Sequence, residues 1–259
     1  MIQTCIALVG ISNFRDFGGV PSSRGAVQPG RLYRSAHHGQ ATAGDLALLA
    51  ELDIPLVVDL RKADERNRYP SKRPIGFAGR VLERMDRMDG DQPPHFAFLA
   101  ESGLTPERIR QYMLDAYAEF PYDESLLALY RQYIAALAAG PASVLVHCAA
   151  GKDRTGFVVA LTQYLLGVSP ETRMREYLLT NETMPAEGRL PGIAAAFLKT
   201  HGKPVDEALL RIVLHATPVF LETAFNTIRK QDGSVETYFE RQLGMDANMR
   251  ARIEHHFLA

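Results

Sequence analysis

One cysteine stands between an apolar run and a short loop of small and charged residues. The stretch from His147 to Gly156 reads HCAAGKDRTG, and Arg154 lies where a helix is expected to begin. A thiol at a helix N-terminus lies at the positive end of the helix dipole, which favours the reactive thiolate. The free N–H groups of the same helix start bind anions. The residues therefore predict that Cys148 is a sulfur nucleophile facing a bound anion, and we call residues 148–154 the cysteine loop.

The residues after the cysteine fit a tetrahedral anion. The small side chains of Ala149, Ala150 and Gly151 allow the backbone to close around it. Arg154 can bind two of its oxygens with a planar, permanently charged group, and Thr155 can donate its hydroxyl to the sulfur. This combination fits in-line attack on phosphorus, with the donors stabilising charge on the equatorial oxygens and a cysteinyl-phosphate as the intermediate.

Two apolar runs are predicted to be the strands that position this loop. Residues 55–61 (PLVVDLR) and 143–148 (SVLVHC) are short and continuous, as is typical of strands buried on both faces. Helical periodicity occurs in 105–120, 123–140 and 154–167. The order of strands and helices predicts an α/β fold with a mainly parallel sheet. Ligands of such sheets bind at the carboxyl ends of the strands, where the cysteine loop begins.

The rest of the chain is predicted to be mainly helical. Residues 11–36 alternate apolar stretches with Gly and Pro turns, which predicts a hairpin or a pair of short strands. A helix is expected after Thr42, and residues 62–94 have the composition of a charged loop. Beyond Ser169 the segments have helical periodicity and are separated by Gly or Pro, so no further strand is expected. We expect a single domain, residues 1–259.

Composition limits the partners and the compartment. The 259 residues carry 29 Lys and Arg against 30 Asp and Glu, so no overall field attracts nucleic acid or an anionic membrane. Two cysteines are too few for a disulfide framework. We expect no signal peptide and no transmembrane segment, which would need about 20 apolar residues. The sequence thus predicts a cytoplasmic protein, although a dedicated export route would leave no such trace, and it leaves the oligomeric state open.

The order of residues in the cysteine loop resembles a known group of enzymes. His, Cys, five residues, Arg, Thr and Gly occur in this order in the protein tyrosine phosphatase superfamily, and HCAAGKDRTG is similar to its bacterial branch of tyrosine and lipid phosphatases. The stretches NFRDFGG (13–19), VVDLR (57–61) and YMLDAYAEFP (112–121) are similar to that branch too. The resemblance therefore spans most of the chain and is weaker across 62–100 and after Thr180.

The resemblance implies a fold, a mechanism and a substrate class. The fold is the three-layer phosphatase fold, with a central, mainly parallel sheet flanked by helices, a helical C-terminal part and a helical lid at about 184–216. The mechanism needs no metal and no cofactor and passes through a phosphocysteine. The implied substrates are proteins phosphorylated on tyrosine, and in several members on serine or threonine, with phosphoinositides as the alternative. Inorganic phosphate is the product.

The same resemblance implies roles within the loop. Cys148 is the expected nucleophile and Arg154 the phosphate clamp. Lys152 is similar to the lysine with which lipid-active members bind additional phosphates; the alternative is a solvated loop charge. Asp153 either handles protons or is structural. The expected phosphate-binding residues are Ala149, Ala150, Gly151, Lys152, Asp153, Arg154 and Thr155.

The general acid is expected on a separate loop, where tyrosine phosphatases usually carry an aspartate. Residues 83–92 (ERMDRMDGDQ) offer Asp86, Asp89 and Asp91. Asp86 is the best candidate, because its spacing from the first predicted strand is similar to that of the family's aspartate. The alternative for each of the three is an exposed charged loop.

Further residues are expected to support the site. His147 can orient the loop by hydrogen bonding, a role that we favour over proton transfer. Asp59 and Arg61 end a predicted strand, so they lie near the site and either serve it or only pair with each other or with a loop amide. The same two alternatives hold for Arg15 and Asp16.

Other functions use similar residues. A lone Cys148 would more often be an inert core thiol, and Cys5 is expected to be a packing residue, with a redox partnership to Cys148 as the alternative. A phosphate-binding module without turnover is disfavoured by the intact Cys148 and Arg154. A rhodanese-like sulfurtransferase also holds a cysteine in an anion-binding loop, but that loop lacks the Gly-Lys-Asp-Arg-Thr run.

Overall fold

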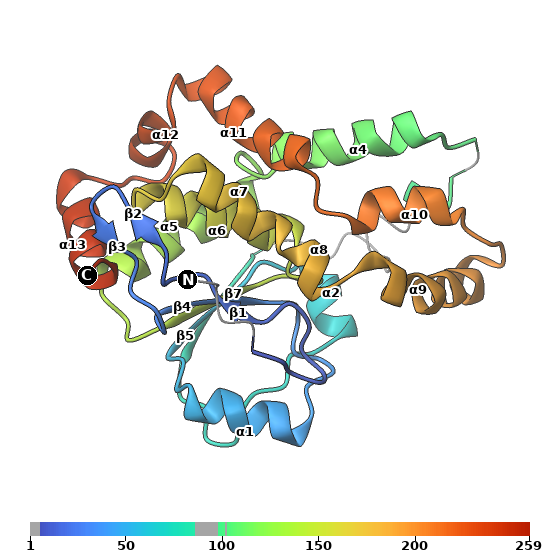
Figure 1. Ribbon diagram of the computed structural model, residues 1–259, viewed down its shortest axis with the longest axis horizontal. Helices are drawn as coiled ribbons and strands as arrows, with labels where there is room; N and C mark the ends of the chain where they lie inside the picture. Colours follow the sequence, from blue (N-terminus) through green and yellow to red (C-terminus); the bar gives the residue numbers. More distant parts are fainter. Residues whose placement is uncertain (1–5, 86–97, 102) are drawn as a thin grey trace.

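Helices cover both faces of a central sheet, which gives the molecule three layers (Figure 1). The structure is a computed structural model in which residues 6–85, 98–101 and 103–259 are described. Helix α1 (Ala43–Glu51) lies on one face of the sheet, and most of the other helices lie on the opposite face (Figure 1). The three-layer architecture with a helical C-terminal part, expected from the resemblance, is confirmed for these residues.

The sheet has five strands and is mainly parallel. β1 (Arg15–Asp16) is antiparallel to β4 (Leu32–Ser35), whereas β4, β7, β5 and β6 run parallel to one another. The order across the sheet is β1 (Arg15–Asp16), β4 (Leu32–Ser35), β7 (Val144–His147), β5 (Leu56–Asp59) and β6 (Arg80–Glu83). Both predicted apolar strands, β5 and β7, are confirmed, and they are central and fully buried as their composition indicated.

The helices follow the predicted periodicities closely. Thr42 caps α1 by accepting a hydrogen bond from Asp45 N, as expected. Pro106 occupies the first turn of α4, and Gly167 follows α6 with a φ of +76°. The remaining helices are α2 (Ala63–Arg68), α4 (Pro106–Glu119), α5 (Glu124–Ala138), α6 (Asp153–Leu165), α7 (Pro170–Leu178), α8 (Thr180–Thr183), α9 (Ala186–His201), α10 (Glu207–Leu214), α11 (Pro218–Asp232), α12 (Val235–Arg241) and α13 (Ala247–Phe257).

Alternate strand residues face the two helical layers, as the two-residue period of a strand requires. Val57 and Leu145 pack in one core with Leu49 of α1. Val58 and Val146 belong to the larger core on the opposite face. Both faces of the sheet are therefore buried, which explains the uninterrupted apolar runs of β5 and β7.

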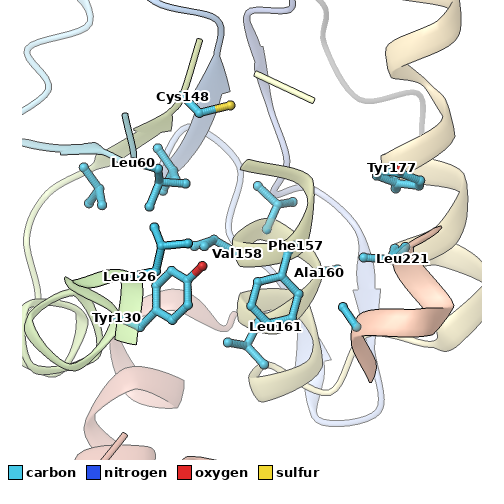
Figure 2. Packing of buried hydrophobic residues seen from close by; sticks show 14 of the residues in the cluster. Leu60, Leu126, Tyr130, Cys148, Phe157, Val158, Ala160, Leu161, Tyr177 and Leu221 are labelled. Atoms are coloured by element: carbon cyan, nitrogen blue, oxygen red, sulfur yellow. The ribbon is translucent and has the colours of Figure 1, made fainter. Parts of the chain in front are cut away.

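Helix α6 fills the larger core, because almost all of its residues are buried. Phe157, Val158 and Leu161 lie near Leu126 and Tyr130 of α5 (Figure 2), and the rings of Phe157 and Tyr130 are 5.8 Å apart. A helix that is buried all round cannot shift without opening the core. Its N-terminus, where the cysteine loop ends, is thus held in place.

Two parts of the chain differ from the prediction. Residues 11–36 contain the expected hairpin, formed by β2 (Pro21–Ser22) and β3 (Gly25–Ala26), but β4 instead joins β7 in parallel. Residues 62–94, expected to be a loop, contain α2 and β6 in their described part. Helix α2 is short and charged. β6 is an edge strand with exposed charged ends, so it lacks the apolar run that identified the central strands.

No helix of the described ranges is by itself long and apolar enough to cross a bilayer. Helices α10 and α11 reach the required length only as a pair that is bent by 50°.

Candidate active site

The cysteine loop connects β7 to α6 at the carboxyl edge of the sheet. Ser35, His147 and Asp59 end three neighbouring strands in register, and Cys148 follows the central one. Cys148 is 2% exposed and lines a cavity of about 450 Å³ together with other residues of the loop. In Figure 2 it lies at the edge of the buried hydrophobic cluster. The central strand therefore delivers this thiol to a cavity wall.

Three carbonyl oxygens of the loop are bound by described residues, whereas the N–H groups of residues 149–152 are not. The oxygens of Ala149, Gly151 and Lys152 all accept hydrogen bonds from protein groups. In contrast, nothing in the described part of the chain accepts from the N–H groups of residues 149–152. Successive unbound N–H groups at the start of a helix form an anion site. The backbone thus provides the cradle that the small residues of the loop indicated.

Arg154 is held by a residue that the sequence analysis missed. Its Nη1 donates to Leu60 O at 3.2 Å and to Glu65 Oε2 at 2.5 Å, and its Nη2 donates to Glu65 Oε1 at 2.8 Å. Burial alone would raise the pKa of Glu65, but the charge and hydrogen bonds of Arg154 lower it to about 2. Glu65 is therefore an ionised partner of Arg154 near neutral pH.

The pairing with Glu65 leaves one edge of the Arg154 guanidinium for a ligand. A guanidinium has five N–H donors, and three of them are used by Leu60 and Glu65. The Nε–H and one Nη2–H meet no acceptor among the described residues. These two donors lie on the same edge, which can bind two oxygens of a tetrahedral anion. Glu65 stands in the first turn of a helix just after the end of β5, and this position is the signal that could have identified it.

Lys152 is not a solvated loop charge. Its side chain is 3% exposed, and its Nζ donates to Val213 O and to His215 O, the latter at 3.4 Å. Asp153 Oδ1 lies 3.2 Å from the same nitrogen. Burial lowers the pKa of Lys152, and the Asp153 carboxylate opposes this effect. The ammonium thus joins the loop to the C-terminal end of α10.

Asp153 lines the cavity and is linked to two buried tyrosines. Tyr117 Oη donates to Asp153 Oδ1 at 2.7 Å, and the hydroxyls of Tyr117 and Tyr177 are 2.6 Å apart. Burial and the Asp153 carboxylate raise the pKa of Tyr117, so its hydroxyl stays protonated. Tyr117 lies in the YMLDAYAEFP stretch, which carries part of the resemblance to the phosphatases, but the sequence predicted no role for this residue.

His147 is buried beside the loop and neutral. Burial lowers its pKa to about 4, although Asp59, whose Oδ2 lies 3.6 Å from His147 Nε2, partly opposes this. Its Nδ1 is 3.3 Å from Cys148 O, and its ring stacks on His38 with 5.1 Å between centroids. A fully buried, neutral ring fits the predicted orienting role better than proton transfer to substrate.

Asp59 and Arg61 pair with each other, one of the two alternatives for them. Arg61 Nη2 and Nε donate to Asp59 at 2.7 and 2.9 Å. Burial alone would raise the pKa of Asp59, but His147 and Arg61 lower it to about 2. Arg61 also lines the cavity, so Asp59 fixes one residue of the cavity wall.

Other predicted residues lie away from the cavity. Arg15 pairs with Glu176, and Asp16 accepts hydrogen bonds from Gly18 N and Gly30 N, so Asp16 shapes the N-terminal turns. Thr155 is fully buried, and its Oγ1 has no hydrogen-bond partner within the described residues. The expected bond to the sulfur is therefore not formed here.

Some predicted residues lie outside the described part of the chain. These are Asp86, Asp89 and Asp91, the candidates for the general acid, together with Cys5. Among the described residues no group of three or more His, Cys, Asp or Glu side chains could hold a metal ion.

Helices α9 and α10 form one wall of the cavity. Arg189 and Ile193 of α9 and Val213 and Leu214 of α10 line it, together with residues of the cysteine loop and α2. The segment after α10 is fixed by Asn181, whose side chain makes two 2.8 Å hydrogen bonds with the backbone of residue 216. The region expected to be a lid thus contributes apolar and basic side chains to the cavity.

Comparison with known proteins extends the resemblance to nearly the whole chain. Residues 6–259 match the sequence pattern of the tyrosine phosphatase family. A Cupriavidus necator protein, named as a tyrosine-protein phosphatase, is 32% identical over 257 residues, 96% of this chain and 86% of that protein. The triple specificity protein phosphatase PtpB of Mycobacterium tuberculosis is 35% identical over 196 residues, 69% of this chain and 70% of its own. A crystal structure of P. aeruginosa TpbA covers 71% of this chain and 87% of its own, at 23% identity and a TM-score of 0.33.

Proposed function

Because the chain belongs to the tyrosine phosphatase family and is therefore a phosphoric monoester hydrolase, we propose that it acts through a phosphocysteine on Cys148. The bacterial branch expected from the cysteine loop is confirmed by its relatives. The observation that carries the mechanism is the loop itself, in which the N–H groups of residues 149–152 have no acceptor in the described chain while the neighbouring thiol lines the cavity. Such a site combines a nucleophile with donors for the phosphoryl oxygens.

The reaction has two steps. The Cys148 thiolate attacks phosphorus, so that an S–P bond forms as the P–O bond to the substrate breaks, and the leaving oxygen takes a proton from a general acid. The loop N–H groups and the Nε/Nη2 edge of Arg154 stabilise the charge on the equatorial oxygens. Water then attacks phosphorus, the S–P bond breaks, and inorganic phosphate leaves as the thiolate is restored.

Two carboxyl groups are candidates for the proton transfers. Asp153 lines the cavity, and its contacts with Tyr117 and Lys152 favour its carboxylate form. A carboxylate accepts a proton, so Asp153 suits the second step, in which water must lose one. Asp86, outside the described residues, stays our candidate for the acid of the first step.

We favour phosphoproteins over phosphoinositides as substrates, with a range wider than phosphotyrosine. The phosphoinositide alternative depended on Lys152 meeting a second phosphate, and the carbonyls of Val213 and His215 occupy its ammonium. A wider range is supported by the similarity to a phosphatase named for triple specificity. We also propose that α9 and α10 are the lid. Phosphate should then slow hydrogen exchange in these helices, and exchange unaffected by phosphate would argue against a lid.

Hydrolysis of p-nitrophenyl phosphate and of a phosphopeptide panel tests the function. The wild type should hydrolyse both, and Cys148→Ser should lose at least about 1,000-fold in kcat, because the nucleophile is gone. Circular dichroism of the variant controls for folding. The cysteine mechanism is wrong if Cys148→Ser keeps the wild-type rate, and the substrate proposal fails if phosphoinositides are hydrolysed much faster than any phosphopeptide.

A further inference from the structure

Two arginines and a glutamate are buried beside the cysteine loop but are not among the residues that line the cavity. Arg15 and Arg34 are 0% exposed and Glu176 is 2% exposed. Glu176 Oε1 accepts from Arg15 Nε at 2.8 Å, and its Oε2 accepts from Arg34 Nη1 at 2.6 Å. We call these three residues the buried triad. Charged groups are costly to bury, so their position next to a phosphate site calls for a physical explanation.

The triad consists of ions in a fixed arrangement. Burial alone would raise the pKa of Glu176, but the charges of Arg15 and Arg34 lower it below its usual range. Guanidinium groups stay protonated in proteins. The Nε of Arg34 has no partner in the described residues, so hydrogen bonds from its two Nη groups orient the guanidinium.

The second Nη group of Arg34 reaches the cysteine loop. Nη2 donates to Gly151 O, which also accepts from Asn13 Nδ2 at 2.7 Å. Gly151 has a φ of +66°, and a Cβ at this position would lie 2.3 Å from Ser35 O, so only glycine fits against β4. A buried cation, a buried amide and close packing therefore fix the Gly151 carbonyl together.

Fixing this carbonyl also fixes the neighbouring donor. In a planar trans peptide the C=O and the N–H point in opposite directions, and the described chain has no cis peptide. Since the Gly151 carbonyl is turned toward Arg34, the N–H of Lys152 in the same peptide is turned away from it. That N–H is one of the loop donors without an acceptor in the described chain, and Lys152 lines the cavity. A charged donor on the carbonyl also polarises the peptide, which makes its N–H a stronger donor.

We propose that Arg34, held by Glu176 and Arg15, is a positioning residue that aims and polarises the peptide between Gly151 and Lys152 toward the bound phosphate. The inference rests on the proposed function, because it needs a phosphate in the cavity. Arg34 acts through the loop and not on the substrate. Its loss should therefore weaken phosphate binding beyond any effect on folding.

A pair of matched variants tests the proposal. Arg34→Met removes the charge and both contacts while keeping most of the side-chain length. Arg31→Met is the control. Arg31 also donates from Nη2 to a backbone carbonyl, Pro141 O at 3.0 Å, and its buried Nε also has no partner within the described chain. Unlike the carbonyl of Gly151, the carbonyl of Pro141 lies outside the cysteine loop. Binding of inorganic phosphate is measured by calorimetry, and as competitive inhibition of p-nitrophenyl phosphate hydrolysis. Urea unfolding of both variants records the loss of stability.

The phosphate Kd should rise about 10- to 100-fold in Arg34→Met, as expected for losing a hydrogen bond from a charged donor. In Arg31→Met it should change less than about 3-fold. If Arg34→Met does not fold, Asn13→Ser provides the second test. It removes the amide donor to Gly151 O and the contact of Asn13 Oδ1 with Arg15, and it leaves the ion pair of Arg34 with Glu176. A rise of about 3- to 10-fold is then expected.

Unchanged phosphate affinity in the folded variant would overturn the inference. Equal weakening in Arg34→Met and Arg31→Met would overturn it too, since that result indicates general destabilisation. Both outcomes differ from failure of the proposed function, in which the wild type binds no phosphate or Cys148→Ser remains fully active.

Discussion

Two arginine–glutamate arrangements flank the cysteine loop, and they differ in what they leave unpaired. Arg154 and Glu65 form a one-to-one pair that lines the cavity and leaves a guanidinium edge without an acceptor in the described chain. In the buried triad, Arg15 and Arg34 share the carboxylate of Glu176, and the Nη2 group of Arg34 donates to the backbone of the cysteine loop. The first arrangement offers donors to a ligand, and the second offers them to the protein.

Burial therefore decides the task of a charged pair. Ions sealed from water contribute rigidity, because removing one partner strands the others in a medium that solvates them poorly. Ions at a cavity wall can also bind a ligand, so their loss should weaken binding in addition to any loss of stability. The two arrangements should therefore respond to mutation in opposite proportions.

The largest expected effect is on stability, from Glu176→Gln. This change leaves Arg15 and Arg34 buried without the carboxylate that they share, which should lower the free energy of unfolding by about 3–5 kcal/mol. Urea denaturation measures it. Glu65→Gln, in the pair that lines the cavity, should cost clearly less, and equal losses would show that burial does not distinguish the two arrangements.

The second effect is on activity, from Glu65→Gln. A glutamine cannot accept from both Nη groups of Arg154, so the guanidinium loses its orientation, and kcat/KM should fall about 10- to 100-fold. Glu119→Gln is the matched control, because Glu119 lines the same cavity without a recorded contact to Arg154. Steady-state kinetics with p-nitrophenyl phosphate decide the matter, and similar rates for the two variants would contradict the assigned role.

Acid should destabilise the protein in two separate pH windows. The pKa of His147 is about 4, below its ordinary 6.5, so the unfolded chain binds more protons between these values and stability falls as the pH drops through this window. Glu65, with a pKa of about 2 against an ordinary 4.5, contributes stability that is lost only as the pH falls below about 4.5. Urea unfolding as a function of pH tests this. Burial also lowers the pKa values of His38 and His37, so His147→Asn should reduce the slope in the upper window without abolishing it. A wild-type profile that is level from pH 6.5 to 4 would contradict the assignment.

The smallest effect is expected for an exposed pair. Arg24 and Glu254 form an ion pair with side chains 42% and 26% exposed, far from the loop in sequence. Glu254→Gln should change the free energy of unfolding by no more than about 0.5 kcal/mol and leave hydrolysis unaltered. A loss as large as that of Glu65→Gln, measured in the same denaturation series, would mean that exposure is a poor guide in this protein.

The sequence predicted what depends on local pattern. The apolar runs of β5 and β7, the start of α1 after Thr42, and the position of Cys148 between strand and helix all follow from residues adjacent in the chain. A buried strand or a helix start is determined largely by its own composition, so these features need no knowledge of distant contacts.

The sequence could not predict which distant residues pair with the charged side chains around the cysteine loop. Glu65 lies 89 positions from its partner Arg154, and Glu176 lies 161 and 142 positions from Arg15 and Arg34, so neither pairing can be read from adjacent residues. Lys152 was expected either to face a ligand or to be solvated, but α10 approaches from a distant part of the chain and takes its ammonium. β6 was missed for the same reason, since only its pairing with β5 makes it a strand.

The order of strands has a consequence for how an active molecule comes into being. β7 is the last strand of the described chain, yet it lies between β4 and β5, with Val144 opposite both Leu32 and Leu56. Until β7 has been synthesised and inserted, the two earlier strands have no common neighbour, and contacts over such sequence separations form slowly. Catalytic competence should therefore be among the last properties to return on refolding, and its recovery would report the closing of the sheet.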